Sequence, residues 1–335
     1  MKRLMTVAPR QCEVVEVDAP ELRDDQILLQ TRVVSVLMEN VGLHTGADPR
    51  LKAPDNPLYR GYPLAQAGEI IAEVVEVGAK VEGVAVGERF ATYANYDEFH
   101  AVAADAWTRI ANTASDETAI SLAFAGTTLH CIRRAGIEIG DDVVIIGQGP
   151  MGLMVTQWAR MAGAGRVIVG DLRPKRLEIA RQMGATHVIE AAAVDFKTRL
   201  YEITEGKGPD VVIDAGNAAA TFPLAMDLAR VKGRIVVISW HTQPITIEDI
   251  TRDFYHKELD ILATRASGPG HAYRSPYLHW TGWENQQLIA RLMAEGRFDP
   301  APLVTDRLPL AQFAEALRRV EEEPETTVKA VVDWA

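Results

Sequence analysis

The sequence predicts an α/β protein in which a doubly wound parallel sheet is inserted into a β-rich domain built from both ends of the chain. Over residues 117–267, apolar strands alternate with helical patterns, which is typical of a parallel sheet covered on both faces. Over residues 1–116, short apolar runs are separated by Gly, Pro, Asn and Asp, which indicates strands joined by turns. The length of 335 residues also favours two domains over a single core.

Individual elements are expected where apolar runs are bounded by turn residues. In the β-rich part, strands are predicted at 27–29, 33–36 and 70–77. The parallel sheet is expected to hold strands at 143–146, 167–169, 211–213, 235–238 and 259–263, with helices at 152–161, 174–183 and 221–231. After residue 268 the alternation stops, and we expect helices at 285–295 and 310–322 and a closing strand at 328–332.

Composition narrows the class of partner. The formal net charge is −11, from 35 basic and 46 acidic residues, which argues against a nucleic-acid binder and against an anionic membrane surface. The sequence has no apolar run suited to a signal peptide or a membrane span. Cys12 and Cys131 are too few for a cysteine-rich zinc site or a disulfide framework. A small-molecule substrate and a cytoplasmic location are expected.

A glycine motif directly follows the strand predicted at 143–146, and it reads Gly147-Gln148-Gly149-Pro150-Met151-Gly152. The first glycine permits a tight turn, the second lets backbone N–H groups approach a pyrophosphate, and the third lets a helix pack closely on the strand. Asp171 follows the next strand, where a carboxylate accepts hydrogen bonds from ribose hydroxyls and repels a 2′-phosphate. The pattern predicts a Rossmann-type dinucleotide site, with NAD favoured over NADP.

Further cofactor contacts are expected where other strands of the sheet end, because open α/β sheets bind ligands there. Ala215 and Gly216 follow one such strand, and Ser239 follows another. His241, two residues later, is either a proton donor or only polar lining, and the sequence leaves both readings open. Arg176, which follows Asp171, lies either near the adenosine or at a solvated helix start.

Several stretches resemble the medium-chain dehydrogenase/reductase superfamily, and together they cover nearly the whole chain. They are residues 72–78 with 86–89, residues 130–136 with 140–143, the glycine motif, and residues 171–185. The detail most resembles the sorbitol and threonine dehydrogenase branch. The resemblance implies a GroES-like catalytic domain over residues 1–116 and 268–335, a Rossmann domain over residues 117–267, and a homodimer or homotetramer.

The chain departs from the zinc enzymes of this family at the positions of their ligands. Leu37-Met38-Glu39-Asn40 stands in place of a Cys-Gly-Thr-Asp-like motif, and Ala67-Gly68-Glu69 in place of Gly-His-Glu. Neither Cys nor Glu occurs at 122–123, where a third ligand would fall, and the cysteine-rich lobe for a structural zinc is missing. Zinc needs three or four close ligands. The resemblance therefore implies a zinc-free member without a metal site.

Without zinc, side chains must stabilise the substrate oxygen and move its proton. The resemblance identifies Glu39, His44 and Glu69 as catalytic candidates, each with a purely structural alternative. Other expected lining groups are Tyr59, Tyr62, Thr127 near the nicotinamide or as a helix cap, and the aromatic segment 267–285 with Trp280 and Trp283.

The expected function is zinc-independent, NAD(H)-dependent interconversion of a secondary alcohol of sugar, cyclitol or polyol type and its ketone. Three alternatives remain open. They are a zinc-free NADPH quinone or enoyl reductase, a redox-neutral enzyme that oxidises its substrate transiently with bound NAD, and a non-catalytic nucleotide sensor. Asp171 argues against the first of these.

Overall fold

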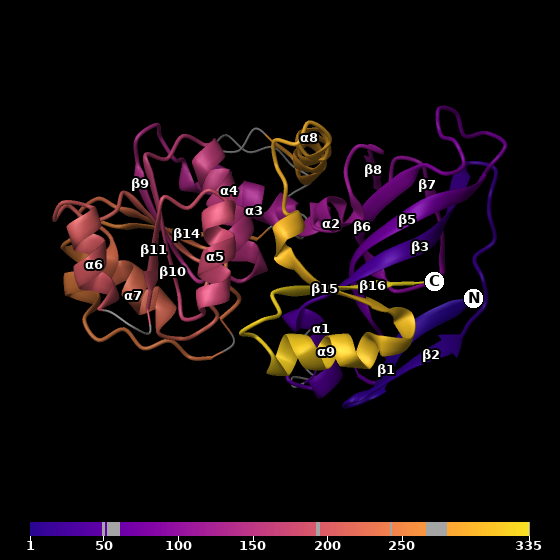
Figure 1. The fold of residues 1–335 in the computed structure, drawn as a ribbon, viewed down its shortest axis with the longest axis horizontal. Helices are drawn as coiled ribbons and strands as arrows, with labels where there is room; N and C mark the ends of the chain where they lie inside the picture. Colours follow the sequence, from indigo (N-terminus) through magenta and orange to yellow (C-terminus); the bar gives the residue numbers. More distant parts are fainter. Residues whose placement is uncertain (49–50, 52–60, 192–194, 242, 266–279, 335) are drawn as a thin grey trace. The chain divides into compact units, whose positions relative to one another are not determined.

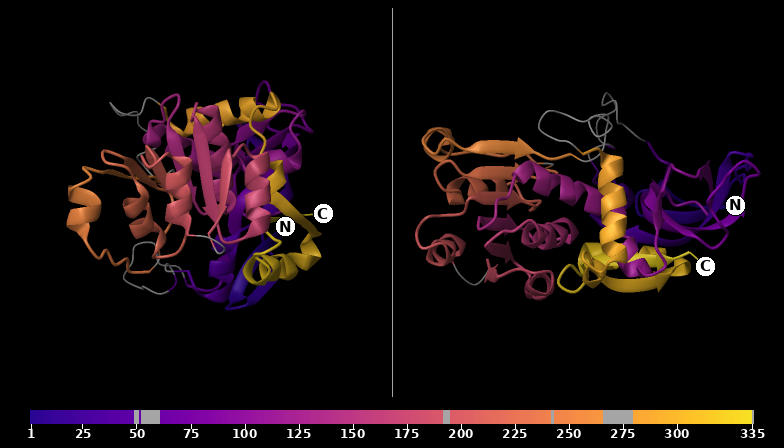
Figure 2. Two further views of the ribbon diagram at one scale, coloured as in Figure 1. Left: turned by 60° about the vertical axis from the view of Figure 1, so that its left-hand side comes forward. Right: turned by 90° about the horizontal axis from the view of Figure 1, so that it is seen from above.

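The computed structural model describes residues 1–48, 51, 61–191, 195–241, 243–265 and 280–334. The chain divides into two compact units, with unit 1 formed by Met1–Ala123 and Gln286–Ala335 and unit 2 by Phe124–Asn285. Both chain ends belong to unit 1 (Figure 2). Unit 2 extends past the boundary expected at 267 because Arg133 holds the later segment, donating to Asn285 Oδ1 at 2.9 Å and lying 4.1 Å from the ring centre of Trp280.

Unit 2 contains the predicted parallel sheet. Its six strands run in the order β11-β10-β9-β12-β13-β14, and every neighbouring pair is parallel. The strands are β9 (Asp142–Ile146), β10 (Arg166–Asp171), β11 (His187–Glu190), β12 (Val211–Asp214), β13 (Arg234–Val237) and β14 (Asp260–Ala263). The helices are α3 (Leu122–Ala135), α4 (Pro150–Met161), α5 (Pro174–Gln182), α6 (Phe196–Ile203) and α7 (Thr221–Leu228), with a π-helical turn η2 (Thr251–Tyr255).

Helices cover both faces of this sheet, with α4 and α5 on one side and α6 and α7 on the other (Figure 1). The central strands β9 and β12 are buried along their whole length, which explains their continuous apolar sequence. One core cluster joins Val144, Ile168 and Val212 of the sheet to Leu200 and Leu228 of the helices. The predicted doubly wound fold is confirmed.

Unit 1 is built mainly on antiparallel strands, with one parallel pair, β15 and β16. One sheet runs β15-β16-β3-β5-β6-β8 with β7 beside β3, and a smaller sheet runs β2-β1-β4. The strands are β1 (Lys2–Ala8), β2 (Gln11–Glu16), β3 (Gln26–Val36), β4 (Leu64–Ala65), β5 (Ala67–Val77), β6 (Arg89–Asn95), β7 (Phe99–Ala103), β8 (Thr108–Ile110), β15 (Val304–Pro309) and β16 (Lys329–Asp333). The helices are α1 (Met38–Thr45), α2 (Asp116–Ala119), α8 (Gly282–Ala294) and α9 (Phe313–Glu322), with short turns η4 (Ala301–Leu303) and η5 (Leu310–Gln312).

The closing strand β16 pairs antiparallel with β3, and β3 pairs with β5, so the two ends of the chain share one sheet. The strands predicted at 27–29 and 33–36 are one strand, β3, with irregular register on both sides of Thr31. Within the described residues, no helix is both long and apolar enough to span a bilayer.

Candidate functional site

The glycine motif forms a tight turn between β9 and α4 in unit 2. Gly147 has φ +90°, and a Cβ there would lie 2.9 Å from Gly216 Cα. A Cβ on Gly152 would lie 2.0 Å from Gly147 O, so only glycine lets α4 approach the strand. At Gly149, the N-cap of α4, a Cβ would meet no described atom within 4 Å. This open space beside a helix N-terminus fits a pyrophosphate.

The turn is fixed by a side chain that sequence reasoning did not single out. Gln148 is fully buried; its Nε2 donates to Gly147 O at 3.1 Å, and its Oε1 accepts from Thr156 Oγ1 at 2.9 Å. The bond to Thr156 links the turn to the second turn of α4. A residue between two motif glycines carries no pattern of its own, so only the structure reveals this role.

Asp171 lies at the end of β10, next to the glycine turn. Its Oδ2 accepts from the backbone N–H of Gln148 at 2.7 Å, and its Oδ1 accepts from that of Arg173 at 2.9 Å. Arg176 Nη1 lies 3.8 Å from Oδ2. The structure thus brings Asp171 and Arg176 together at the turn, and the carboxylate orders the backbone that would surround the adenosine ribose.

The remaining cofactor candidates also lie in unit 2. Ala215 and Gly216 follow β12 and Ser239 follows β13, at the carboxyl edge of the sheet. The close approach of Gly147 and Gly216 places the β12 turn against the glycine motif. Met151 lies in the first turn of α4, and Thr127 lies on α3. The neighbouring Thr128 is buried and accepts from Trp158 Nε1 at 3.0 Å.

In unit 1, a tyrosine occupies the space beside the position where the zinc enzymes carry histidine. A Cβ on Gly68 would lie 2.0 Å from Tyr96 Oη and 2.9 Å from its Cζ, so no side chain fits there without displacing the ring. Tyr96 is fully buried; its hydroxyl donates to Ser35 O and accepts from Asn40 Nδ2 at 3.3 Å. Burial raises the pKa of Tyr96, which stays a neutral phenol.

Glu69, the one acidic residue retained from the family motif, is bound to a lysine. Its Oε2 lies 2.5 Å from Lys329 Nζ, and each side chain is 1% exposed. Lys329 also donates to Ser121 Oγ at 2.9 Å and to Ile120 O at 3.4 Å. Burial lowers the pKa of Lys329, while the charge of Glu69 opposes that shift. We conclude that a protein cation already neutralises this carboxylate.

The other catalytic candidates of unit 1 have separate surroundings. Glu39 lies half-buried in the first turn of α1, close enough to Tyr96 to act on its pKa, as Glu69 does. His44, in the last turn of the same helix, places Nδ1 3.2 Å from Cys12 Sγ. Burial lowers the pKa of His44. Glu39 and Glu69 therefore share Tyr96 as a neighbour, whereas His44 is engaged with β2.

Asn40, which follows Glu39, is a structural hub rather than a ligand. Its Oδ1 accepts from Leu37 N at 3.0 Å, and its Nδ2 donates to Gln66 Oε1 and Ala67 O at 3.0 and 2.9 Å. These bonds join α1 to β5. Across the described parts of the chain, no group of three or more His, Cys, Asp or Glu side chains is placed to hold a metal ion.

Some expected lining groups are placed differently or lie outside the description. Tyr62 donates to Leu43 O at 2.7 Å, which supports α1. Trp280 and Trp283 are 42% and 43% exposed, so neither is a core residue of the described structure. Tyr59 and residues 267–279 of the aromatic segment lie outside the described residues.

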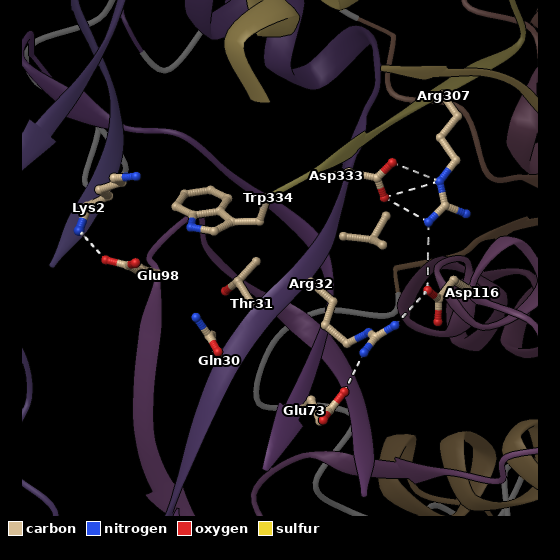
Figure 3. Close-up of a pocket in the computed structure, with 11 residues that line it drawn as sticks. Lys2, Gln30, Thr31, Arg32, Glu73, Glu98, Asp116, Arg307, Asp333 and Trp334 are labelled. Carbon is tan, nitrogen blue, oxygen red and sulfur yellow. Dashed lines mark hydrogen bonds and ion pairs between the residues drawn. The ribbon is translucent and has the colours of Figure 1, made fainter. Parts of the chain in front are cut away.

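A charged hollow of about 630 Å³ lies on unit 1 (Figure 3). Its charges are matched internally, since Arg307 pairs with Asp333 at 2.7 Å and with Asp116 at 3.8 Å, and Arg32 pairs with Glu73. Its lining residues are Lys2, Gln30, Thr31, Arg32, Val33, Glu73, Glu98, Asp116, Arg307, Asp333 and Trp334. None of the residues predicted to bind cofactor or substrate lines it.

Several known proteins are similar to this chain in sequence and in fold. Residues 150–280 match the family model described as "Zinc-binding dehydrogenase". Sorbitol dehydrogenase of Bacillus subtilis (strain 168) is 24% identical over 366 residues, covering 99% of this chain and 97% of the relative. The crystal structure of 2R,3R-butanediol dehydrogenase from Bacillus subtilis superposes with a TM-score of 0.82 at 19% identity, covering 100% of this chain and 99% of that one.

Over nearly its whole length the chain is similar to the zinc-type alcohol, sorbitol and threonine dehydrogenase-like branch of the medium-chain dehydrogenase/reductase superfamily. This similarity supports an oxidoreductase. The NADP-dependent isopropanol dehydrogenase of Entamoeba histolytica is 30% identical over 218 residues, covering 64% of this chain and 57% of the relative. The relatives therefore include an NADP-dependent enzyme. The matched segment 150–280 falls in unit 2, so the word zinc in the family description says nothing of Gly68 or Glu69.

Proposed function

We propose that this protein is a zinc-independent, NAD(H)-dependent dehydrogenase that interconverts a secondary alcohol of polyol, sugar or cyclitol type and its ketone. The observation that carries the proposal is the filled ligand position in unit 1. Tyr96 occupies the space beside Gly68, and Lys329 neutralises Glu69 at 2.5 Å. A zinc ion needs three or four free donors, and these residues do not fit one.

The choice of NAD is supported by Asp171. A carboxylate beside the glycine turn accepts hydrogen bonds from ribose hydroxyls and repels a 2′-phosphate. Its position is fixed by two backbone N–H groups at 2.7 and 2.9 Å. Arg176 lies 3.8 Å away and partly offsets the negative charge, so we expect a preference for NAD rather than exclusion of NADP.

The substrate class is supported by the relatives, whose names include sorbitol and 2R,3R-butanediol dehydrogenases. Both names denote oxidation of polyhydric or vicinal alcohols. Unit 1 offers polar groups to such a substrate, above all the half-buried Glu39 in the first turn of α1. We assign Glu39 the orientation of a substrate hydroxyl, and Glu69 and His44 supporting roles through Lys329 and Cys12.

NAD, when bound, supplies the hydride acceptor. The chain then has three tasks, which are to hold the pyrophosphate at the N-terminus of α4, to disfavour a 2′-phosphate with Asp171, and to hold and move the hydroxyl proton. In zinc enzymes the metal lowers the barrier to that proton loss. Here a side-chain base must do so, with Tyr96 held neutral by burial and therefore unable to act as a phenolate.

Metal analysis and cofactor titration test the proposal together. The purified protein should contain no stoichiometric zinc, and prolonged dialysis against EDTA should leave turnover of D-sorbitol, erythritol or 2,3-butanediol with NAD unchanged. Calorimetry should show tighter binding of NADH than of NADPH. One tightly held zinc per chain that is lost together with activity would refute zinc independence, and equal or tighter NADPH binding would refute the cofactor assignment. Accumulation of NADH excludes a redox-neutral reaction.

A further inference from the structure

A histidine–aspartate pair lies at the carboxyl edge of the sheet in unit 2. Asp214 is the last residue of β12, and His241 follows the neighbouring strand β13. Asp214 Oδ2 lies 2.8 Å from His241 Nε2. The turn after Asp214 is the one that meets the glycine motif, because Gly216 Cα lies 2.9 Å from the Cβ position of Gly147. The pair therefore stands beside the dinucleotide site.

The surroundings of Asp214 fix the tautomer of the imidazole. The carboxylate is fully buried; its Oδ1 accepts from the backbone N–H of Gly216 at 3.1 Å, and its Oδ2 faces His241. An ionised carboxylate can only accept hydrogen bonds, so Nε2 must carry the proton and donate it. Ser239 Oγ, which donates to Asp214 O at 2.9 Å, lies 3.3 Å from the same Nε2. Nδ1 is left with a lone pair.

That second nitrogen has no partner among the residues that the structure describes. Nδ1 of His241 is buried and forms no hydrogen bond with any described residue, while the whole side chain is 10% exposed. Buried polar atoms are nearly always hydrogen-bonded, and exceptions in native proteins point to a catalytic role or to a partner that is not part of the chain. An imidazole that is hydrogen-bonded to a carboxylate at one nitrogen and has no described partner at the other is arranged like the histidine of a general base.

Two of the three candidates of unit 1 are engaged with other side chains. Nδ1 of His44 is taken by Cys12 at 3.2 Å, and Glu69 is held by Lys329 at 2.5 Å. A carboxylate bound to an ammonium ion is a weaker proton acceptor, because taking a proton would break the ion pair in a buried setting. His241 instead gains a stronger bond to Asp214 when it becomes charged.

We propose that His241 is the acid–base residue of the reaction and that Asp214 is its positioning residue. The inference rests on the proposed function. In alcohol oxidation NAD, when bound, would supply the acceptor for the hydride of the substrate carbon. The hydroxyl O–H bond breaks, and its proton passes to His241 Nδ1 as the C=O bond forms. The imidazolium keeps its Nε2–H bond to Asp214. In the reverse direction Nδ1 returns the proton to the carbonyl oxygen.

The first test uses turnover with matched variants. His241→Gln should lower kcat for the best of D-sorbitol, erythritol and 2,3-butanediol by roughly 10²–10⁴-fold, with NADH affinity by calorimetry within a few-fold of wild type. Imidazole added to His241→Gly should restore part of the rate in proportion to its concentration. The control His256→Gln, an exposed histidine of the same unit, should show no loss and no rescue. Near wild-type turnover of His241→Gln would overturn the inference.

The second test reads the tautomer without turnover. In ¹⁵N-histidine-labelled protein, His241 Nδ1 should give the signal of an unprotonated ring nitrogen, assigned by its loss in His241→Gln, and that signal should move when NADH is added. Asp214→Asn can donate to Nε2 and should switch the proton to Nδ1 while keeping an acceptor for Gly216 N–H. A protonated Nδ1 in the wild type would overturn the inference. So would a ¹⁵N signal of His241 Nδ1 that does not change when NADH is added. Failure of NADH to bind at all would instead refute the proposed function.

Discussion

Lys329 and Glu69 form a buried ion pair at the position where the zinc enzymes of the family carry a ligand motif. Their charged atoms lie 2.5 Å apart with 1% of each side chain exposed. Taking both charges out of water is costly, and their mutual attraction offsets that cost only while both are present. The two charges therefore stabilise unit 1 only together. The positive charge of Lys329 balances the negative charge that Glu69 would otherwise present to its surroundings.

Removing one member should be more harmful than removing both. We expect Glu69→Gln and Lys329→Met each to lower the free energy of unfolding by about 3–5 kcal/mol, because an unpaired buried charge remains. The double variant Glu69→Leu/Lys329→Met should recover most of the loss. Urea unfolding followed by circular dichroism measures this. Lys80→Ala, which breaks the exposed pair with Asp24 at 3.0 Å, is the control and should cost at most about 1 kcal/mol. Additive losses in the double variant would contradict the prediction.

Gly68 and Tyr96 form a second pair whose members depend on each other. Gly68→Ala should lower the free energy of unfolding by about 1–3 kcal/mol, because its Cβ would lie 2.0 Å from Tyr96 Oη. In a Tyr96→Phe background, which removes that oxygen, the same substitution should cost less. Gly42→Ala is the control, since its Cβ would meet ordinary contacts at 3.7 Å in α1. An equal cost of Gly68→Ala in both backgrounds would argue against the contact.

At the scale of elements, the turn between β9 and α4 depends on the end of β10. Asp171 accepts from Gln148 N on one side and Arg173 N on the other, so it holds two loops together. Gln148 in turn holds Thr156 of α4 at 2.9 Å. The proposed cofactor preference and the order of the two loops therefore depend on the same carboxylate.

Asp171→Ala should act on both properties. We expect weaker NADH binding, a smaller difference between NADH and NADPH affinity, and a loss of about 1–3 kcal/mol in the free energy of unfolding, because buried Gln148 loses the acceptor for its backbone N–H. Calorimetry and urea unfolding measure these changes. Lys175→Ala, which removes an exposed lysine paired with Glu178, should leave all three values unchanged. A full NADH preference in Asp171→Ala would show that another group discriminates.

The same elements show what could be predicted from the sequence. Strands β9, β10 and β12 were predictable because their apolar runs are buried on both faces, and the glycine motif fixed the turn that follows. The edge strand β11 was missed because a four-residue strand with His and Glu at its ends carries no apolar pattern. Helix α6, which follows it, was also missed. Helix α7 ends at Leu228 rather than at the expected 231, since Ala229 is extended, with ψ 139°.

The candidate site was only partly predictable, for a physical reason. The glycine motif and Asp171 are close in sequence, so their spacing alone indicates that they lie together. Glu69 and Lys329 are 260 residues apart, and only the pairing of β16 with β3 and of β3 with β5 joins them. Likewise, the bond between Asp214 and His241 requires β12 and β13 to be neighbours. Resemblance indicated which zinc ligands were missing, but not what had filled their space.

On the scale of the whole molecule, the sheet of unit 2 ends at β14. Three of the four residues of this strand are exposed, and Ile261 is 37% exposed. Exposed edge strands are usually covered by another chain or protected by charge. We therefore predict a homo-oligomer, at least a dimer, that forms through this edge.

Light scattering at micromolar concentration should give at least twice the mass of one chain, which is 36.8 kDa. Ile261→Lys adds a charge to the edge and should shift the protein toward the monomer without lowering the affinity for NADH. The control Ile139→Lys changes an isoleucine that is 94% exposed and lies outside β14. A monomeric wild type would contradict the prediction.

The tyrosine beside Gly68 has a consequence for how this chain could change over generations. Histidine at position 68 meets Tyr96 at 2.0 Å, while removal of the Tyr96 ring leaves a buried cavity. Freeing Glu69 by replacing Lys329 leaves a buried charge. Each single substitution toward a metal-binding site is therefore expected to give a less stable protein, whatever its effect on the reaction. The interior packing around Gly68 and Glu69 therefore opposes a stepwise change of this region into a zinc site.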